Sequence, residues 1–349
     1  MEIKDLLRDN IKALKPYSTA RDEYQDQADI FLDANENAHG SATEKAYNRY
    51  PDPKQALLKE RISQIKGIPP RHIFIGNGSD EAIDLLIRAF CEPKRDNIIV
   101  LPPTYGMYEV AAAINAVTVK KVPLAPDFQL DLDSIAEQVD AQTKIIFICS
   151  PNNPTGNAID PRDVEVILNN FEGIVVVDEA YINFSRQSSM IRELTEYPNL
   201  VVLQTFSKAW GLAGLRVGMA FASLPVVEVL NKIKSPYNIS QPSQEEALEA
   251  LNSLEKVNNW IKDIVRERNK LANVLAQLDF VVKVFPSDAN FLLVQVKDAD
   301  KMYTYLLENG VIVRDRSKLE ECKGCIRITI GTTQENQRLI HLLQQFNTL

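Results

Sequence analysis

Cysteine, histidine and long apolar runs are scarce in this chain of 349 residues, which has four cysteines and three histidines. Four cysteines do not make a disulfide framework in a chain this long, and this usage is typical of a reducing cytoplasm. No run approaches the ~18 apolar residues that a membrane span requires. The first ten residues alternate charged and single apolar side chains, so we expect no signal peptide. The composition predicts a cytoplasmic protein.

Blocks of basic residues are also absent. The formal net charge is -8 at pH 7, and no Lys/Arg-rich segment offsets it, which argues against nucleic acid as a partner. A local cationic pocket for an anionic substrate is compatible with this balance. The length exceeds what one small core needs and fits a large domain plus a smaller one.

Cys322 and Cys325 have the spacing of a metal-binding or redox pair. A second pair is missing from the sequence, and His39, His72 and His341 are scattered along it. We favour two cysteines around a tight Lys-Gly turn, with zinc or redox roles as the alternatives. The sequence therefore predicts no metal site.

Short apolar runs rich in β-branched residues mark the middle of the chain, at 73–75, 98–101, 145–149, 174–177, 201–205 and 217–222. Such runs, without polar alternation, are typical of strands buried on both faces. Amphipathic segments between them, such as 82–90, predict covering helices. The pattern predicts an α/β fold with a large, doubly wound, mostly parallel sheet.

The pattern of predicted helices and strands changes after residues 235–240. A long helical stretch at about 244–278 leads into shorter elements, with strands at 281–285, 291–296, 311–313 and 325–330 and helices near 299–309 and from residue 333. This alternation predicts a smaller α+β domain.

Within residues 205–218, Lys208 lies at the end of an apolar run, and Arg216 follows eight positions later. An amine with a lowered pKa can form a Schiff base with a carbonyl, and an arginine can hold a phosphate by charge-assisted hydrogen bonds. The alternative is a Lys/Arg pair on a solvated face. Gly211, Gly214 and Gly218 favour a specialised backbone segment over a surface helix.

Polar residues follow the predicted strands at their carboxyl ends, in segments 76–79, 150–156, 178–181 and 207–208. Open α/β sheets bind ligands at that edge. We therefore expect these side chains to converge on one crevice.

Residues 205–218 resemble the cofactor-binding lysine segment of the fold type I pyridoxal phosphate aminotransferases, and more narrowly that of histidinol-phosphate aminotransferases. Further motifs stand in the family's order at 32–37, 50–52, 76–81, 102–108, 150–156, 178–181 and Arg327. The resemblance covers nearly the whole chain. It implies an N-terminal arm (1–30) that packs with the small domain, a large cofactor-binding domain (31–243) and a small C-terminal domain (244–349).

The implied cofactor is pyridoxal 5'-phosphate, held by Lys208, which also moves a proton during catalysis. Asp178 would pair with the pyridine nitrogen, although a helix N-cap is an equal alternative from the residue type alone. Tyr181 and Asn153 would hydrogen-bond the phenolic oxygen, with turn chemistry as a second role for Asn153. Tyr105 would stack on the ring, with core packing as its alternative.

The turn at 76–81 lies between a strand and a helix, where free N–H groups favour an anion. Glu81 stands where a dinucleotide-binding fingerprint needs its third glycine, so we reject a dinucleotide site at this turn. Tyr50 matches a tyrosine that reaches the cofactor phosphate of the neighbouring subunit, which implies a homodimer with composite sites. By resemblance, the phosphate ligands within the chain are Gly78, Ser79, Asp80, Ser207 and Arg216.

Arg327 and Arg314 interrupt apolar segments, where a cation is unfavourable without an anionic partner. A salt bridge to Asp315 or Glu320 is the alternative for Arg314. The resemblance implies that Arg327 binds the anionic group of the substrate and, in turn, the carboxylate of 2-oxoglutarate.

Tyr17 and Asn37 would join Arg314 in holding the substrate phosphate, again by resemblance. The family's usual proline after residues 35–37 is replaced here by Ala38.

The implied reaction is transamination of L-histidinol phosphate with 2-oxoglutarate, giving imidazole acetol phosphate and glutamate, in histidine biosynthesis. An aromatic amino acid aminotransferase and a threonine-phosphate decarboxylase of the same fold are the alternatives. A cofactor-binding regulator or inactive scaffold is the rival from another class. The presence of Lys208 and the lack of an appended DNA-binding module in this sequence weigh against it.

Overall fold

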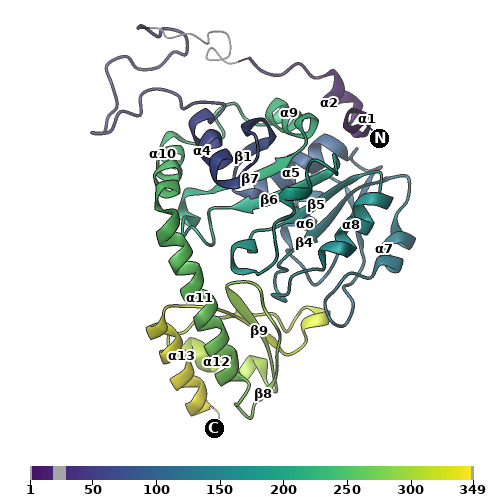
Figure 1. Cartoon of the computed structure of the whole chain (residues 1–349), viewed down its shortest axis with the longest axis vertical. Helices are drawn as coiled ribbons and strands as arrows, with labels where there is room; N and C mark the ends of the chain where they lie inside the picture. The colour runs from purple at the N-terminus through teal and green to yellow at the C-terminus, as the bar shows by residue number, and fades with distance from the viewer. Residues whose placement is uncertain (1, 19–28, 347–349) are drawn as a thin grey trace.

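The computed structural model describes residues 2–18 and 29–346, which form two sheets and the helices packed on them (Figure 1). The large sheet has the strand order β1-β7-β6-β5-β4-β2-β3. Its strands are β1 (Ile73–Asn77), β2 (Asn97–Val100), β3 (Thr118–Lys121), β4 (Thr143–Cys149), β5 (Ile174–Asp178), β6 (Leu200–Thr205) and β7 (Val217–Ala222).

Parallel pairing joins β3, β2, β4, β5 and β6, while β7 runs antiparallel to both of its neighbours, β1 and β6. This arrangement confirms the predicted α/β fold with a mostly parallel sheet. The edge strand β3 was not predicted, because its residues are half-buried or exposed and include two lysines.

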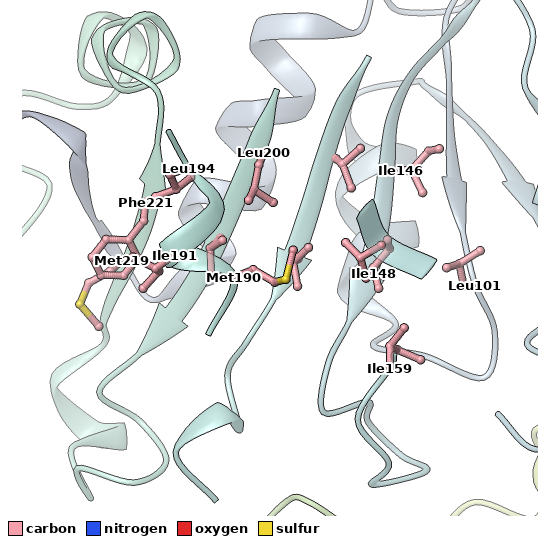
Figure 2. Close-up of a cluster of buried hydrophobic side chains, with 14 of the residues drawn as sticks. Leu101, Ile146, Ile148, Ile159, Met190, Ile191, Leu194, Leu200, Met219 and Phe221 are labelled. Atoms are coloured by element: carbon pink, nitrogen blue, oxygen red, sulfur yellow. The ribbon is translucent and has the colours of Figure 1, made fainter. Parts of the chain in front are cut away.

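Helices cover both faces of the large sheet (Figure 1). The first face carries α4 (Ala56–Lys66), α7 (Leu132–Gln138) and α8 (Pro161–Asn170), and the second carries α5 (Ser79–Phe90), α6 (Met107–Ile114) and α9 (Leu224–Ile233). Since side chains alternate along a strand, Ile146 and Ile148 enter the core on the first face, which Figure 2 shows, and Ile145 and Phe147 enter the core on the second. The strand ends are therefore held from both sides.

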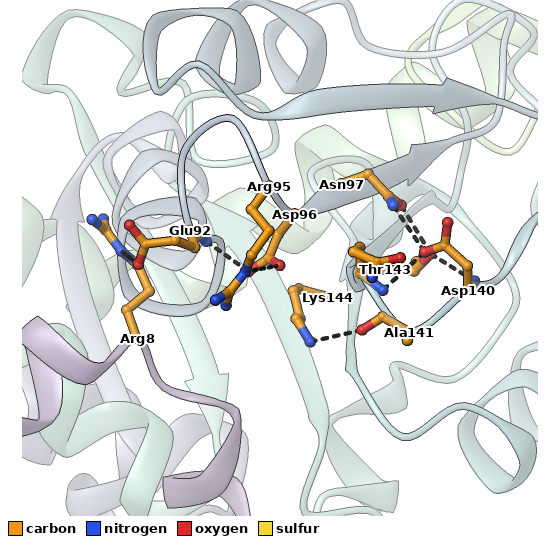
Figure 3. A network of polar contacts seen from close by, with 10 residues as sticks. Arg8, Glu92, Arg95, Asp96, Asn97, Asp140, Ala141, Thr143 and Lys144 are labelled. Atoms are coloured by element: carbon orange, nitrogen blue, oxygen red, sulfur yellow. Dashed lines mark hydrogen bonds and ion pairs between the residues drawn. The ribbon is translucent and has the colours of Figure 1, made fainter.

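A polar network ties β2 to β4 at their amino ends (Figure 3). Asn97 Nδ2 donates to Asp140 Oδ1 at 3.0 Å, and Thr143 Oγ1 donates to Asn97 Oδ1 at 2.8 Å. Hydrogen bonds from Lys120 and then Asn97 hold the pKa of the Asp140 carboxyl well below its usual range. These contacts fix the strands at the edge opposite to their carboxyl ends.

The N-terminal arm begins with α1 (Ile3–Leu6) and α2 (Asp9–Ala13). Ile3 and Ile11 are buried in the core that contains α5 and α9 of the large domain. Arg8 Nε lies 3.2 Å from Glu92 Oε2, and Lys232 Nζ donates to the Ile11 carbonyl at 2.7 Å. The described start of the arm therefore packs on the large domain, and the predicted contact with the small domain is wrong for these residues.

The small domain has an antiparallel sheet in the order β10 (Arg314–Asp315), β11 (Cys325–Thr329), β9 (Phe291–Val296) and β8 (Val281–Val284). Helices α12 (Ala299–Glu308) and α13 (Thr333–Phe346) pack with it. The predicted strand at 311–313 is wrong: the strand begins at Arg314, and Ile312 is 80% exposed.

The predicted helix at 244–278 is two helices, α10 (Gln241–Ala250) and α11 (Leu254–Leu275), separated by the 3-10 turn η5 (Leu251–Ser253). Helix α10 lies beside α4, and α11 runs from there to the small sheet (Figure 1). Helix α10 therefore crosses the predicted boundary at residues 243/244. Within the described ranges, no helix combines the length and the apolar character that a membrane span requires.

Candidate active site

A cleft of about 640 Å³ lies where the carboxyl ends of β4, β5 and β6 meet the start of α5 and the edge of the small sheet. It brings together most of the side chains that the sequence singled out. From the large domain these are Gly78, Ser79, Asp80, Tyr105, Asn153, Asp178, Tyr181, Ser207, Lys208 and Arg216, and from the small domain Arg314 and Arg327.

Close backbone packing shapes one end of the cleft. Gly78, at the N-cap of α5, has a φ of +73°, and a Cβ there would lie 2.7 Å from Arg216 Nη2. A Cβ on Gly218 would lie only 2.2 Å from the backbone nitrogen of Ser79. The positive φ at Gly78 and the backbone contact at Gly218 both favour glycine, and they bring β7 and Arg216 against the start of α5.

An anion fits this end of the cleft. The first N–H groups of α5 have no intrahelical partner, and the helix dipole adds positive potential there. Arg216 Nη2 lies 3.4 Å from Asp80 Oδ2, and Ser207 lines the same cleft. Backbone donors, a hydroxyl and a guanidinium together match the chemistry of a phosphate group.

Asp178 is 3% exposed at the end of β5. Tyr108 Oη donates to its Oδ2 at 2.7 Å, and Ala180 N donates to its Oδ1 at 3.1 Å. Burial raises the pKa of Asp178 to about 6, against the opposing effect of these two hydrogen bonds. As a local cap, Asp178 therefore accepts one hydrogen bond, from the backbone N–H of Ala180. Its carboxylate also faces the cleft, where a cationic group would stabilise the negative charge.

Tyr108 and Tyr105 divide the aromatic roles. Tyr108 is fully buried and stacks on Phe147 at 4.7 Å between ring centroids. Tyr105 is half-buried at the cleft, with its hydroxyl donating to Asp80 Oδ1 at 3.1 Å. The Tyr105 ring also packs edge-on against Tyr108, with 5.6 Å between ring centroids, so it contacts the core as well as lining the cleft. Its stacking on a cofactor ring stays a prediction.

Lys208 follows β6 and is accessible from the cleft. Its Nζ lies 5.5 Å from the centroid of the Tyr181 ring. Desolvation by the surrounding protein lowers the pKa of Lys208, Arg327 lowers it further, and Asp178 opposes the change. A larger neutral fraction makes this amine a better nucleophile and base.

Arg327 extends from β11 over the ring of Phe291, with its guanidinium carbon 5.2 Å from the ring centroid. Its Nη1 donates to Asn153 Oδ1, which joins the small domain to the large one across the cleft. This contact leaves the amide N–H groups of Asn153 as donors. Burial is the main cause of the lowered pKa of Arg327.

Arg316 also lines the cleft, and our sequence reasoning missed it. Two residues after Arg314, it would face the same side of an extended segment, and that spacing was the available signal. Arg314 itself is exposed, because the strand expected around it is only two residues long. Our inference that Arg314 is a buried cation is therefore wrong.

Tyr17, Asn37 and Tyr50 lie outside this cleft in the single chain. Tyr17 is 76% exposed and lines a separate hollow near Lys59. Asn37 Oδ1 accepts the N–H of His39 at 3.0 Å. None of the three lines the cleft of its own chain. The substrate contacts of Tyr17 and Asn37, and the contact of Tyr50 with the cofactor phosphate of a neighbouring subunit, stay predictions.

The thiols of Cys322 and Cys325 are free and buried. Gly324 between them has a φ of +71°, as the predicted tight turn requires. Burial raises the pKa of Cys322 to about 12 and that of Cys325 to about 11, so neither forms a thiolate readily. In the part of the chain that the structure describes, no three His, Cys, Asp or Glu side chains gather as metal ligands.

Comparison with known proteins shows the family of this chain. The family model described as aminotransferase class I and II matches residues 21–343. The chain belongs to the aminotransferase class I and II family. Family members among the curated proteins include the histidinol-phosphate aminotransferases of Parabacteroides distasonis, 53% identical over 343 residues and 98% of each chain, and of Cytophaga hutchinsonii, 55% identical over 344 residues and 99% of each chain.

The fold of this aminotransferase is that of a solved relative. The histidinol-phosphate aminotransferase of Sinorhizobium meliloti, crystallised in complex with pyridoxal-5'-phosphate, superposes with a TM-score of 0.79 over 90% of each chain at 23% identity. This likeness shows that the two chains share a fold.

Proposed function

We propose that this aminotransferase uses pyridoxal 5'-phosphate to transfer an amino group from L-histidinol phosphate to 2-oxoglutarate in histidine biosynthesis. The observation that carries the proposal is the meeting of Lys208, Asp178 and the anion-binding start of α5 in one cleft. Relatives at 53% and 55% identity over nearly the whole chain carry the histidinol-phosphate name, so the aromatic and decarboxylase alternatives are not favoured.

When bound, the cofactor supplies a carbonyl that captures amines and a ring that accepts electrons from the substrate Cα. The anion-binding end of the cleft, with Ser79, Ser207 and Arg216, would hold its phosphate. Asp178 would keep the proton on the ring nitrogen, since a buried carboxylate gains most from a cationic partner.

Lys208 would supply the amine that anchors the cofactor, and it would then be the base that takes the proton from the substrate Cα. Its lowered pKa favours the neutral amine that this step needs. Tyr181 and the amide N–H groups of Asn153 would donate to the phenolic oxygen of the cofactor. Arg327, 5.2 Å above the ring of Phe291, would bind the anionic group of each substrate in turn.

A second subunit would complete the site. Tyr50 is 51% exposed and stacks on Tyr237 at 4.4 Å in a hollow of about 520 Å³ that also contains Arg49. Tyr237 is half-buried, and a partly exposed aromatic pair of this kind suits a subunit interface. We infer a homodimer in which Tyr50 reaches the partner's cofactor phosphate, in a cytoplasmic enzyme, as the cysteine usage indicates.

The test is a coupled assay of glutamate formation from L-histidinol phosphate and 2-oxoglutarate, with the Lys208→Ala protein as control. The proposal expects turnover by the wild type and none by the variant. Circular dichroism should show that the variant is folded. Substantial turnover by Lys208→Ala without added amine, or none by the wild type, contradicts the proposal.

A further inference from the structure

Three arginines meet at the edge of the small sheet that faces the cleft. Arg314 on β10 lies directly opposite Arg327 on β11 in the antiparallel register. Arg316 continues this pairing, because its backbone N–H donates to the Cys325 carbonyl at 2.9 Å. Side chains two residues apart on an extended segment face the same side, and all three arginines line the cleft.

These guanidinium groups lack a carboxylate partner among the residues that line the cleft. The two carboxylates there are Asp80, which lies beside Arg216 and Tyr105, and Asp178, which accepts from Tyr108. Like charges opposite one another in a sheet destabilise it. A bound anion from solution would offset the repulsion among the three guanidinium groups, so we infer that the cleft binds one here.

Arg316 is placed more firmly than Arg314. Arg314 is exposed, whereas Arg316 is half-buried. The Nε of Arg316 is fully buried and has no hydrogen-bond partner, and it is the one such side-chain atom that a cleft residue contributes in the described ranges. Burial lowers the pKa of Arg316, and Arg327 and Arg314 lower it further. The charged guanidinium of Arg316 is therefore only partly compensated by the protein, and a bound anion would stabilise it.

We propose that Arg316 is a specificity-determining residue, which together with Arg327 selects a substrate bearing a phosphate over one bearing a single carboxylate. A phosphate monoester carries nearly two negative charges at neutral pH and three acceptor oxygens, enough for more than one guanidinium. The proposal rests on the proposed function, since it names how that function distinguishes its amino donor from glutamate.

Single-turnover kinetics of the holoenzyme test the role of Arg316. Arg316→Gln should lower kcat/KM for L-histidinol phosphate about tenfold or more, the usual effect of losing one hydrogen bond to a charged group. For L-histidinol, which lacks the phosphate, and for L-glutamate the loss should be several-fold smaller. Arg316→Lys should recover part of the loss. Lys318→Gln removes one charge from an exposed site on the same loop, outside the cleft lining, and should change none of the three rates.

Thermal unfolding gives a readout that does not depend on turnover. Inorganic phosphate should raise the Tm of the wild-type holoenzyme more than that of Arg316→Gln, and without phosphate the variant should be at least as stable, because one repulsive charge is gone. Equal rate losses for all three amines, or no loss, overturn the proposal. A wild-type enzyme that ignores L-histidinol phosphate instead overturns the proposed function itself.

Discussion

Asp178 shows at the scale of one residue how the cleft is tuned. Its carboxylate is buried, it accepts two hydrogen bonds from the protein, and its pKa is still raised to about 6. Two neutral donors do not fully compensate a buried charge. A cation beside this carboxylate would stabilise its charge, and the protonated ring nitrogen of the cofactor would be such a cation.

Asp178→Asn should leave the shape of the cleft nearly unchanged and slow the chemical step at least ~10²-fold, on the scale of other proton-transfer and electrostatic partners. A neutral amide no longer holds the proton on the ring nitrogen. Single-turnover rates with saturating amine measure the effect. Rates near those of the wild type would show that Asp178 is only a local cap for Ala180.

The same residue predicts a pH effect on the cofactor-free protein. Because the folded pKa of Asp178 lies above its usual 3.8, at about 6, the carboxyl favours the folded state at low pH, and this contribution is lost as the pH rises through about 6. The free energy of unfolding of the wild type, relative to Asp178→Asn, should therefore fall as the pH rises from 3.8 to about 6. The expected slope is on the order of 1 kcal/mol per pH unit. Urea unfolding at several pH values measures it, and a constant difference would contradict it.

Sequence reasoning found the polar residues that directly follow buried strands, such as Asp178 and Lys208, because strand ends converge by topology. It missed Arg316 and the hydrogen bond of Tyr108 to Asp178. Those two depend on the register of β10 with β11 and on the packing of α6 against the sheet, and neither is encoded in local sequence pattern.

At the scale of elements, the strands were predictable where burial on both faces leaves a continuous apolar run, as in β4, β5 and β6. The half-exposed edge strand β3 gives no such run. The antiparallel direction of β7 and the break between α10 and α11 at residues 251–253 arise from tertiary packing, so the sequence pattern could not show them.

Gly218→Ala tests how β7 positions the start of α5. The added Cβ would lie 2.2 Å from Ser79 N and 2.4 Å from the Gly78 carbonyl carbon, so the strand and the helix must separate. We expect a loss of about 1–3 kcal/mol in unfolding free energy, typical of overpacking, and weaker cofactor binding in an absorbance titration. Gly214→Ala is the matched control, since nothing lies within 4 Å of its Cβ. Equal behaviour of the two variants would contradict the close approach.

At the scale of the whole molecule, the described start of the N-terminal arm and Tyr50 both lie apart from the cleft of their own chain. The described arm packs on α5 and α9 of its own large domain, and Tyr50 faces a separate hollow. A residue so placed can serve catalysis from a neighbouring subunit without reaching the cleft of its own chain.

Heterodimers test the composite site. The proposal that Tyr50 acts across a subunit interface makes a specific prediction. Wild type mixed with a Tyr50→Ala, Arg216→Ala double variant should give heterodimers with two singly damaged sites and no intact one. The activity of the separated heterodimer, compared with the wild-type homodimer, is the measurement. Half of the wild-type activity would show that Tyr50 works within its own chain.

The central claim is that this cleft is built for an amino donor bearing a phosphate. It is tested most directly by a stopped-flow panel that follows the absorbance of the bound cofactor with L-histidinol phosphate, phenylalanine, threonine phosphate and glutamate. The account predicts that L-histidinol phosphate reacts with the highest kcat/KM, with glutamate reacting measurably as the partner of the return half-reaction. A preference for phenylalanine, or for threonine phosphate with release of carbon dioxide, would contradict the account.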